Sequence, residues 1–172
     1  MFRLAKKEDI LAVTHIYDEI HQQEAEGKTT IGWIPKIYPV EETARQAIER
    51  NDLFVYEENN KILAAAIINQ SQVDSYYKGK WEYTAEDNEV MVLHTLVVSP
   101  SAGGKGIGKR FVSFYEQYAS KHGCKFLRMD TNAINSRART LYNKLGYTET
   151  DIVPCVFNGI PNVQLVLLEK KL

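Results

Sequence analysis

The chain contains little cysteine: among its 172 residues there are only Cys124 and Cys155. Small secreted domains that depend on disulfides carry more cysteines at closer spacing, so that class is excluded. The CxxC and HExxH spacings of common zinc sites are also missing, and we expect no metal site. Two reduced thiols in a cytoplasmic protein are the expectation that this composition favours.

Long apolar runs are absent too. The longest, Ile62–Ile68, has the length of a strand, and the first ten residues, MFRLAKKEDI, lack the apolar run of a signal peptide or membrane span. We therefore expect no membrane partner and a cytoplasmic location. Repeats, low-complexity tracts and linkers are missing as well, and the length then predicts one domain over residues 1–172.

The chain also lacks an excess of charge of either sign. The formal net charge is −1, which excludes a uniformly basic nucleic-acid binder, so no nucleic-acid partner is expected. The sum nevertheless hides a division. Residues 103–144 contain nine basic and two acidic side chains, whereas the rest of the chain contains twelve basic and twenty acidic ones. We expect this basic segment to bind an anionic group.

The apolar pattern that is present predicts a mixed α/β layer protein. Strands are expected at Phe2–Leu4, Leu53–Glu57, Ile62–Asn69, Val90–Val98, Phe126–Asp130, Tyr147–Cys155 and Val163–Glu169. Helices are expected from Lys7 to about Gln22, at Val40–Arg50, from Ile107 to about His122, and at Ile134–Leu145. The order β-α-α-β-β-β-α-β-α-β-β includes one strand–helix–strand crossover, between residues 90 and 130.

A glycine-rich turn, GGKGIGK at residues 103–109, joins the strand Val90–Val98 to the next helix. Closely spaced glycines let backbone N–H groups converge, and a helix N-terminus adds partial positive charge, so the turn predicts a phosphate-type anion site. Two nucleotide motifs fail here. Arg110 stands where a P-loop needs Ser or Thr, and Lys109 where a dinucleotide motif needs its third glycine. A P-loop phosphotransferase is therefore disfavoured.

Two segments together resemble the GNAT family of N-acetyltransferases, which use acetyl-CoA. Residues 93–108, LHTLVVSPSAGGKGIG, resemble its motif A, which ends Q/R-x-x-G-x-G/A; Gly103 stands where Gln or Arg is usual. Residues 135–147, NSRARTLYNKLGY, resemble its N-x-x-A-x-x-L-Y-x-x-x-G-F/Y segment. The resemblance implies the GNAT fold: a mixed, mostly antiparallel central sheet of about six to seven strands flanked by about four helices.

The resemblance also implies the cofactor contacts. Strand residues Leu96–Val98 would offer edge backbone to the pantetheine arm, as an added strand does, and the N–H of Leu96 would polarise the thioester carbonyl. The turn would hold the pyrophosphate mainly through backbone donors, which the change at Gly103 does not remove. The full set implied to contact acetyl-CoA is Leu96, Val97, Val98, Gly103, Gly104, Lys105, Gly106, Ile107, Gly108, Lys109, Asn135 and Tyr142.

The same resemblance places Tyr142 near the CoA sulfur as a proton donor, with Asn135 two turns earlier on the same helix face. A base is expected as well, because alkyl amines with a pKa of about 10 are mostly protonated at neutral pH. His94 is the leading candidate: we expect its side chain on the strand face of Leu96, and one family member has a catalytic histidine at the matching position. Asp130, Glu89 and a water molecule stay open, and Asp130 could instead bind a substrate ammonium.

Aromatic residues are expected to wall the acceptor side. Trp33 and Tyr38 are the main candidates, with Tyr76, Tyr77 and Trp81, although most such residues serve as core or loop anchors. The acidic balance of residues 1–102 favours an amine acceptor. The expected reaction is direct acetyl transfer to a primary amine of a small molecule or peptide; the alternative is a catalytically silent CoA-binding module. The acceptor and oligomeric state stay open, homodimers being common in the family.

Overall fold

One seven-stranded sheet, in the order β1-β2-β3-β4-β5-β7-β6, forms the centre of the computed structural model, which describes residues 1–172. Its strands are β1 (Phe2–Leu4), β2 (Leu53–Glu58), β3 (Lys61–Asn69), β4 (Val90–Val98), β5 (Phe126–Asn132), β6 (Thr148–Phe157) and β7 (Ile160–Lys171). The helices are α1 (Ile10–Ala25), α2 (Glu41–Glu49), α3 (Ile107–Lys121) and α4 (Ser136–Lys144). Only β4 and β5 pair in parallel, so the expected mixed, mostly antiparallel sheet with four helices is confirmed.

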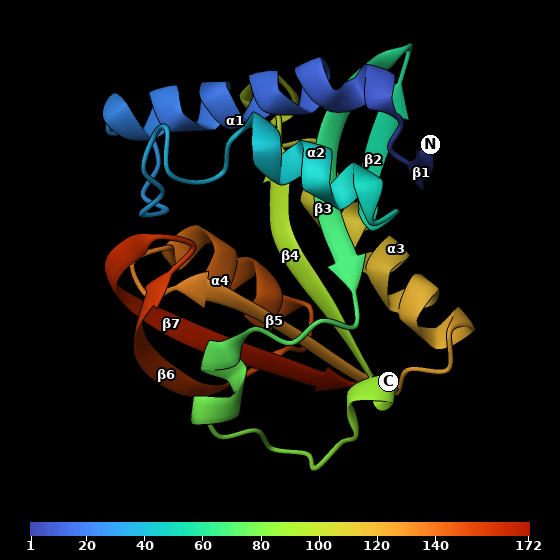
Figure 1. Ribbon diagram of the computed structural model, residues 1–172, viewed down its shortest axis with the longest axis vertical. Coiled ribbons are helices and arrows are strands. Elements are labelled where there is room, and N and C mark those ends of the chain that lie inside the picture. The colour runs from blue at the N-terminus through green and yellow to red at the C-terminus, as the bar shows by residue number, and fades with distance from the viewer.

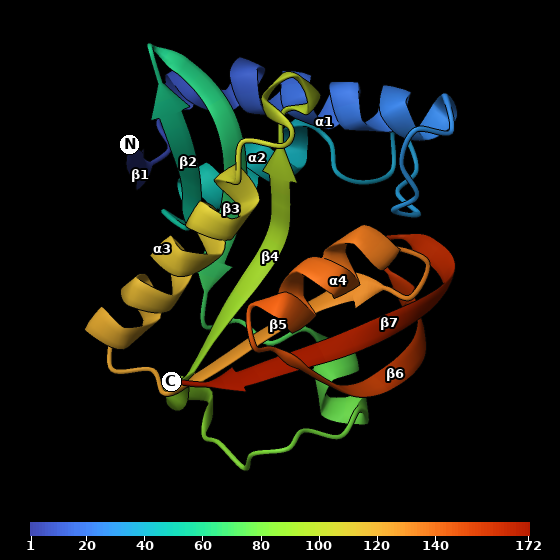
Figure 2. The same cartoon turned by 180° about the vertical axis from the view of Figure 1, so that it is seen from behind.

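The helices cover the sheet on both faces. Helices α1 and α2 lie over one face of the N-terminal strands, while α3 and α4 lie on the opposite face (Figures 1 and 2). Each face encloses its own apolar core: Val13 and Ala47 pack with Val97 on the first face, and Phe111 packs with Leu93 on the second. A third core, around Val92 and Leu167, lies beneath residues 70–89. No helix combines the length and apolarity needed to cross a bilayer.

Strands β4 and β5 diverge halfway along their length. They pair from Val90 opposite Phe126 only as far as Leu93 opposite Met129. Beyond that point β4 follows β3, whereas β5 follows β7 to Asn132. In Figure 1 the upper end of β4 points toward α1 while β5 and β7 run below it. Residues 94–98 therefore have a strand partner on one edge only.

A β-bulge interrupts β4 at the divergence. Val97 is paired with Ala65 and His94 with Ile67, and Thr95 between them has a φ of 51°. An extra residue inverts the side-chain alternation that follows it. Leu96 accordingly packs into the α3-side core. The prediction that His94 and Leu96 share a strand face is therefore wrong, because the bulge at Thr95 places residues two apart in sequence on opposite faces.

Most predicted element ends differ from the observed ones by one to three residues. One difference affects the site: the last helix begins at Ser136 rather than Ile134, because Asn135 is its N-cap and adopts non-helical torsions. Asn135 and Tyr142 are thus not two residues of one helix face. The turn between β2 and β3 is as expected: Asn59 and Asn60 both have positive φ, the backbone of a tight hairpin turn.

Candidate active site

The divergence of β4 from β5 opens into a cleft of ≈ 1070 Å³. Its walls come from the loop before α2, the end of β4, the start of α3, the end of β5 and α4. Fifteen of the predicted site residues line it: Trp33, Tyr38, His94, Leu96, Val97, Val98, Gly103, Gly104, Gly106, Ile107, Gly108, Lys109, Asp130, Asn135 and Tyr142. Lys105 is exposed on the turn and does not line the cleft.

The glycine-rich turn presents backbone donors to this cleft. Gly104 and Gly106 have φ values of 77° and 70°, a left-handed backbone that favours glycine, and Gly106 is the N-cap of α3. No side chain caps this helix, so N–H groups of its first turn lack partners within it. Gly103 has an ordinary φ, but a Cβ there would lie 3.1 Å from the carbonyl oxygen of Pro100. Close backbone packing thus accounts for a small residue at this position.

The basic segment divides into paired and unpaired cations. Ion pairs join Lys125 to Glu89, Arg128 to Glu169 and Arg139 to Glu149. Arg110 donates a 2.8 Å hydrogen bond to the hydroxyl of Tyr56 and lies over its ring. The cations that line the cleft without an ion pair are Lys109, Arg137 and Lys144. The excess positive charge therefore faces the cleft from α3 and α4, which suits an anionic ligand.

Asp130 lies directly beyond the last residue pair of β4 and β5. Its Oδ2 accepts a 2.6 Å hydrogen bond from the hydroxyl of Tyr76, while Oδ1 accepts none and is not sealed from solvent. Burial raises the pKa of Asp130 to about 6, and the hydrogen bond from Tyr76 opposes that rise. A carboxylate with a pKa close to neutral is suited to accept a proton.

Tyr142 approaches the same space from the other face of the sheet. Its ring belongs to the α3- and α4-side core, whereas Asp130 faces the core beneath residues 70–89. Burial raises the pKa of Tyr142 above its usual range, and the charge of Asp130 adds to that rise. The hydroxyl is therefore protonated at neutral pH. Asn135, at the start of the same helix, accepts a 3.1 Å hydrogen bond from the backbone N–H of Ala138.

His94 is held in one tautomer by its neighbours. The side-chain N–H₂ of Asn69 donates to Asp52 at 2.8 Å, which turns the amide oxygen of Asn69 toward Nε2 of His94, 3.0 Å away. Because that oxygen only accepts, Nε2 carries the proton and Nδ1 is the lone-pair atom. Burial lowers the pKa of His94 to about 4, although the Asp52 carboxylate opposes this. The imidazole is therefore neutral at pH 7 and a weak base.

The expected aromatic wall consists of two residues rather than five. Trp33 and Tyr38 line the cleft with their rings 6.0 Å apart, edge to face, and the hydroxyl of Tyr38 is hydrogen-bonded to Thr95 at the bulge. Tyr77 is exposed, and neither Tyr76 nor Trp81 lines the cleft; both anchor residues 70–89. Glu89 also lies outside it, because it pairs with Lys125 where β4 begins. It is therefore remote from the other candidate residues.

Sequence reasoning missed the partners of the candidate bases. Asn69 stands 25 residues from His94, and Tyr76 stands 54 residues from Asp130, so no local motif joins them. Arg137 lies inside the second motif segment, where its charge was a usable signal for an anion contact. Thr95 gave no signal, since β-branched residues rarely adopt a positive φ.

Two curated proteins are similar to part of this chain. The uncharacterized N-acetyltransferase YhfO of Bacillus subtilis is 40% identical over 60 residues, which span 35% of this chain and 40% of that protein. The uncharacterized N-acetyltransferase MJ1207 of Methanocaldococcus jannaschii is 30% identical over 73 residues, 42% of this chain and 32% of that protein. The matched region thus spans less than half the length of either relative.

Solved structures show the same fold along the whole chain. A GNAT-family acetyltransferase from Streptococcus agalactiae aligns with a TM-score of 0.82 at 20% identity, covering 100% of this chain and 95% of that one. The protein yncA from Salmonella typhimurium, solved with its cofactor acetyl-CoA, aligns with a TM-score of 0.71 at 19% identity, covering 99% and 92%. The sequence profile of the acetyltransferase (GNAT) family matches residues 13–147. The chain therefore belongs to the acetyltransferase (GNAT) family.

Proposed function

We propose that this protein transfers the acetyl group of acetyl-CoA to a primary amine of a small molecule or peptide, by direct attack in a ternary complex. One observation carries the proposal: a carboxyl group and a tyrosine hydroxyl reach one cleft from opposite faces of the sheet, beside an unpaired strand edge and a cationic turn. Acid and base in one cleft are what amide formation from a thioester requires.

The cleft fits the proposed donor along its length. The uncapped N-terminus of α3 offers backbone N–H groups to a pyrophosphate, and Lys109, Arg137 and Lys144 add positive charge. The open edge of residues 94–98 offers backbone groups to an extended pantetheine arm. When bound, acetyl-CoA supplies an activated acyl carbon. The family membership and the solved relative that contains acetyl-CoA support this choice of donor.

We assign the base role to Asp130 rather than His94. Asp130 lines the cleft, its Oδ1 accepts no hydrogen bond, and its pKa of about 6 leaves it ionised at neutral pH while it can still hold a proton. The same carboxylate attracts an ammonium before the amine is deprotonated. His94, with a pKa of about 4, is a much weaker base, and we assign it a supporting role in the wall.

Three groups of the protein then act in the proposed reaction: Asp130, the backbone N–H of Leu96, and Tyr142. The bound ammonium first loses one proton to solvent and becomes the neutral amine. Asp130 then takes the second proton, which the nitrogen releases as its lone pair forms the new bond to the acyl carbon, and passes it to solvent after the transfer. The backbone N–H at Leu96 stabilises the developing oxyanion. Tyr142 donates its proton to the sulfur as the carbon–sulfur bond breaks, and regains one from solvent.

The decisive experiment measures thiol release from acetyl-CoA with a panel of primary amines, each compared with hydrolysis in the absence of amine. We expect at least one amine to release CoA well above that background. Acetyl-CoA binding with no amine-dependent release from a broad panel would favour the catalytically silent module instead.

The choice of base is tested on the active amine. With Asp130 as base, kcat/KM decreases as pH falls through about 6, because the protonated carboxyl cannot accept the amine proton. We call this decrease the acidic limb of the pH profile. Asp130→Asn should remove that limb together with most of the rate. A limb that persists in Asp130→Asn and disappears in His94→Gln would overturn the assignment.

A further inference from the structure

Residues 70–89, which connect β3 to β4 and which we call the strap, cross the face of β5, β7 and β6. Gly79 approaches β7 so closely that a Cβ there would lie 2.2 Å from Cδ1 of Leu167. The backbone N–H of Lys80 donates to Asp151 of β6 at 2.8 Å. The strap is thus fitted to the sheet by close packing and by backbone hydrogen bonds.

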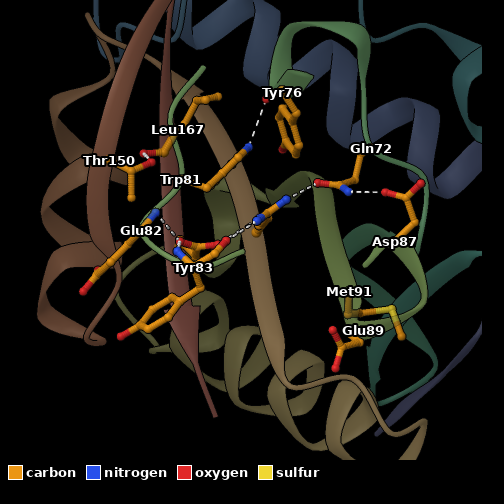
Figure 3. A network of polar contacts seen from close by, with 12 residues as sticks. Gln72, Tyr76, Trp81, Glu82, Tyr83, Asp87, Glu89, Met91, Thr150 and Leu167 are labelled. Atoms are coloured by element: carbon orange, nitrogen blue, oxygen red, sulfur yellow. Dashed lines mark hydrogen bonds and ion pairs between the residues drawn. The ribbon is translucent and has the colours of Figure 1, made fainter. Parts of the chain in front are cut away.

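A buried ion pair beneath the strap fixes its course. Arg128 of β5 and Glu169 of β7 are joined at 2.9 Å, with 6% and 0% of their side chains exposed. Oε2 of Glu169 accepts the backbone N–H groups of Glu82 and Tyr83 at 2.9 and 3.1 Å. Figure 3 shows Glu82 and Tyr83 on one side of the network of polar contacts and Gln72 on the other.

The guanidinium of Arg128 uses its remaining donors on the strap. Nη1 donates to the side-chain oxygen of Gln72 at 2.7 Å, and Nη2 donates to the backbone oxygen of Tyr83 at 3.0 Å. Its carbon lies 4.2 Å from the ring centroid of Trp81, a cation–π contact. Two segments of the strap are therefore tied to one side chain, which a planar fork can do and a lysine cannot.

This network ends at Tyr76. The indole N–H of Trp81 donates to the backbone oxygen of Tyr76 at 3.0 Å, and the two rings meet edge to face at 5.1 Å. Tyr76 is 1% exposed, and its ring is packed within the core beneath the strap. The hydroxyl of Tyr76 donates a hydrogen bond to Oδ2 of Asp130 at 2.6 Å.

We propose that Tyr76 is a positioning residue: held by the Arg128–Glu169 network, it occupies Oδ2 of Asp130, stabilises the carboxylate and leaves Oδ1 as the one oxygen that faces the amine. The inference rests on the proposed role of Asp130. It assigns a part in the reaction to the strap, which contributes no base or acid of its own.

No other group around Asp130 stabilises its ionised form. Tyr38 and Tyr142 face the same carboxylate, and each has a raised pKa to which the charge of Asp130 contributes after burial. No positively charged side chain pairs with Asp130, because Arg128, two residues earlier, is paired with Glu169 and His94 is neutral. Tyr76 is therefore the principal group that favours the ionised carboxyl.

The test is Tyr76→Phe, which keeps the buried ring and removes one hydroxyl. We expect the acidic limb of kcat/KM to move up by about one pH unit, a loss of about tenfold at pH 5 and almost none above pH 8.5. The matched control is Tyr115→Phe. Tyr115 is equally buried, but its hydroxyl donates to the backbone oxygens of Met91 and Arg128, so its loss should not move the limb.

A readout without turnover separates this inference from the proposed function. In protein labelled with carboxyl-¹³C aspartate, the resonance that Asp130→Asn removes reports the titration of Asp130 directly. Tyr76→Phe should raise that midpoint whether or not an acceptor amine is known. An unchanged midpoint overturns the inference. A raised midpoint with an unmoved kinetic limb also overturns it, because Tyr76 would then tune a carboxyl that is not the base.

Arg128→Lys tests the network that holds Tyr76. This variant keeps a positive charge opposite Glu169 but loses the fork to Gln72 and Tyr83, so the strap should loosen. We expect the Asp130 midpoint to rise in the folded variant, by less than in Tyr76→Phe. A folded Arg128→Lys protein with the native midpoint would show that Tyr76 holds its place without the network.

Discussion

The two sides of the cleft are built in different ways. The side that we assign to the donor consists of the open β4 edge, an uncapped helix N-terminus and the cations of α3 and α4. The acceptor side consists of Trp33 and of Asp130, His94 and Tyr38, and each of these last three is hydrogen-bonded to a residue distant in sequence. Backbone groups dominate the first side and buried side-chain contacts the second.

This difference has a physical consequence. Backbone donors keep their positions as long as the helix and strand form, so the donor side does not need a Gln or Arg side chain at position 103. The acceptor side depends on hydrogen bonds in a poorly solvated setting, where a single lost partner is expensive. Substitutions on the donor side should therefore change mainly the binding of acetyl-CoA, whereas substitutions on the acceptor side should change the stability of the protein and its pH dependence.

The largest expected effect is a loss of catalytic rate, and it concerns Tyr142, which lies between the two sides. Tyr142→Phe should lower kcat by about 10²–10⁴-fold, because the leaving sulfur loses its proton donor, and should raise the KM for acetyl-CoA far less. Steady-state kinetics with the active amine measure this. Tyr147→Phe is the matched control, since its hydroxyl contacts Glu116 rather than the cleft. A Tyr142→Phe enzyme with native kcat would remove the acid role.

A large stability effect is expected beneath the acceptor side. Arg128→Leu should lower the free energy of unfolding by about 3–5 kcal/mol, because Glu169 is left as a buried charge without its partner. Denaturant unfolding measures the loss. Arg128→Leu combined with Glu169→Leu should recover much of it, since neither charge is then buried alone. Equal instability of the single and double variants would count against the ion-pair explanation.

Asp130 should also couple stability to pH. Its pKa is raised to about 6 in the folded protein from 3.8, so the folded state binds more protons than the unfolded one between these values. The protein should therefore lose about 3 kcal/mol of stability relative to Asp130→Asn as pH rises from below 4 to above 6. Parallel unfolding curves at several pH values measure the difference. A constant difference across that range would show that Asp130 titrates normally.

The smallest effect is expected on the donor side. Lys109→Ala together with Arg137→Ala should weaken acetyl-CoA binding by about tenfold, because two cations near the bound phosphates are lost. The effect should shrink at high salt, where charge interactions are screened. Titration calorimetry at two ionic strengths measures this. Lys121→Ala, on the same helix but outside the cleft, is the control and should bind normally.

The sequence could predict the parts that depend on local pattern. The strand at Val90–Val98 was predicted with its observed bounds, and the glycine-rich turn was placed between that strand and a helix because both neighbours have clear periodicity. The contacts of the acceptor side could not be predicted in this way. Nothing near Asp130 in the sequence indicates Tyr76, and a period-two rule has no means of anticipating the bulge at Thr95. Packing of distant segments decides these features.

The divergence of β4 and β5 also gives the cleft an uneven stiffness. Strands β4 and β5 are hydrogen-bonded to each other at one end only. A small rotation of one strand about this paired end displaces its unpaired end most. Asp130 adjoins the joined end at Leu93 and Met129, whereas Gly104 and Lys109 lie beyond the free end of β4. We therefore expect thermal motion to be smallest near Asp130, where atoms must be aligned for chemistry, and largest near Gly104 and Lys109, where a long ligand must enter and leave.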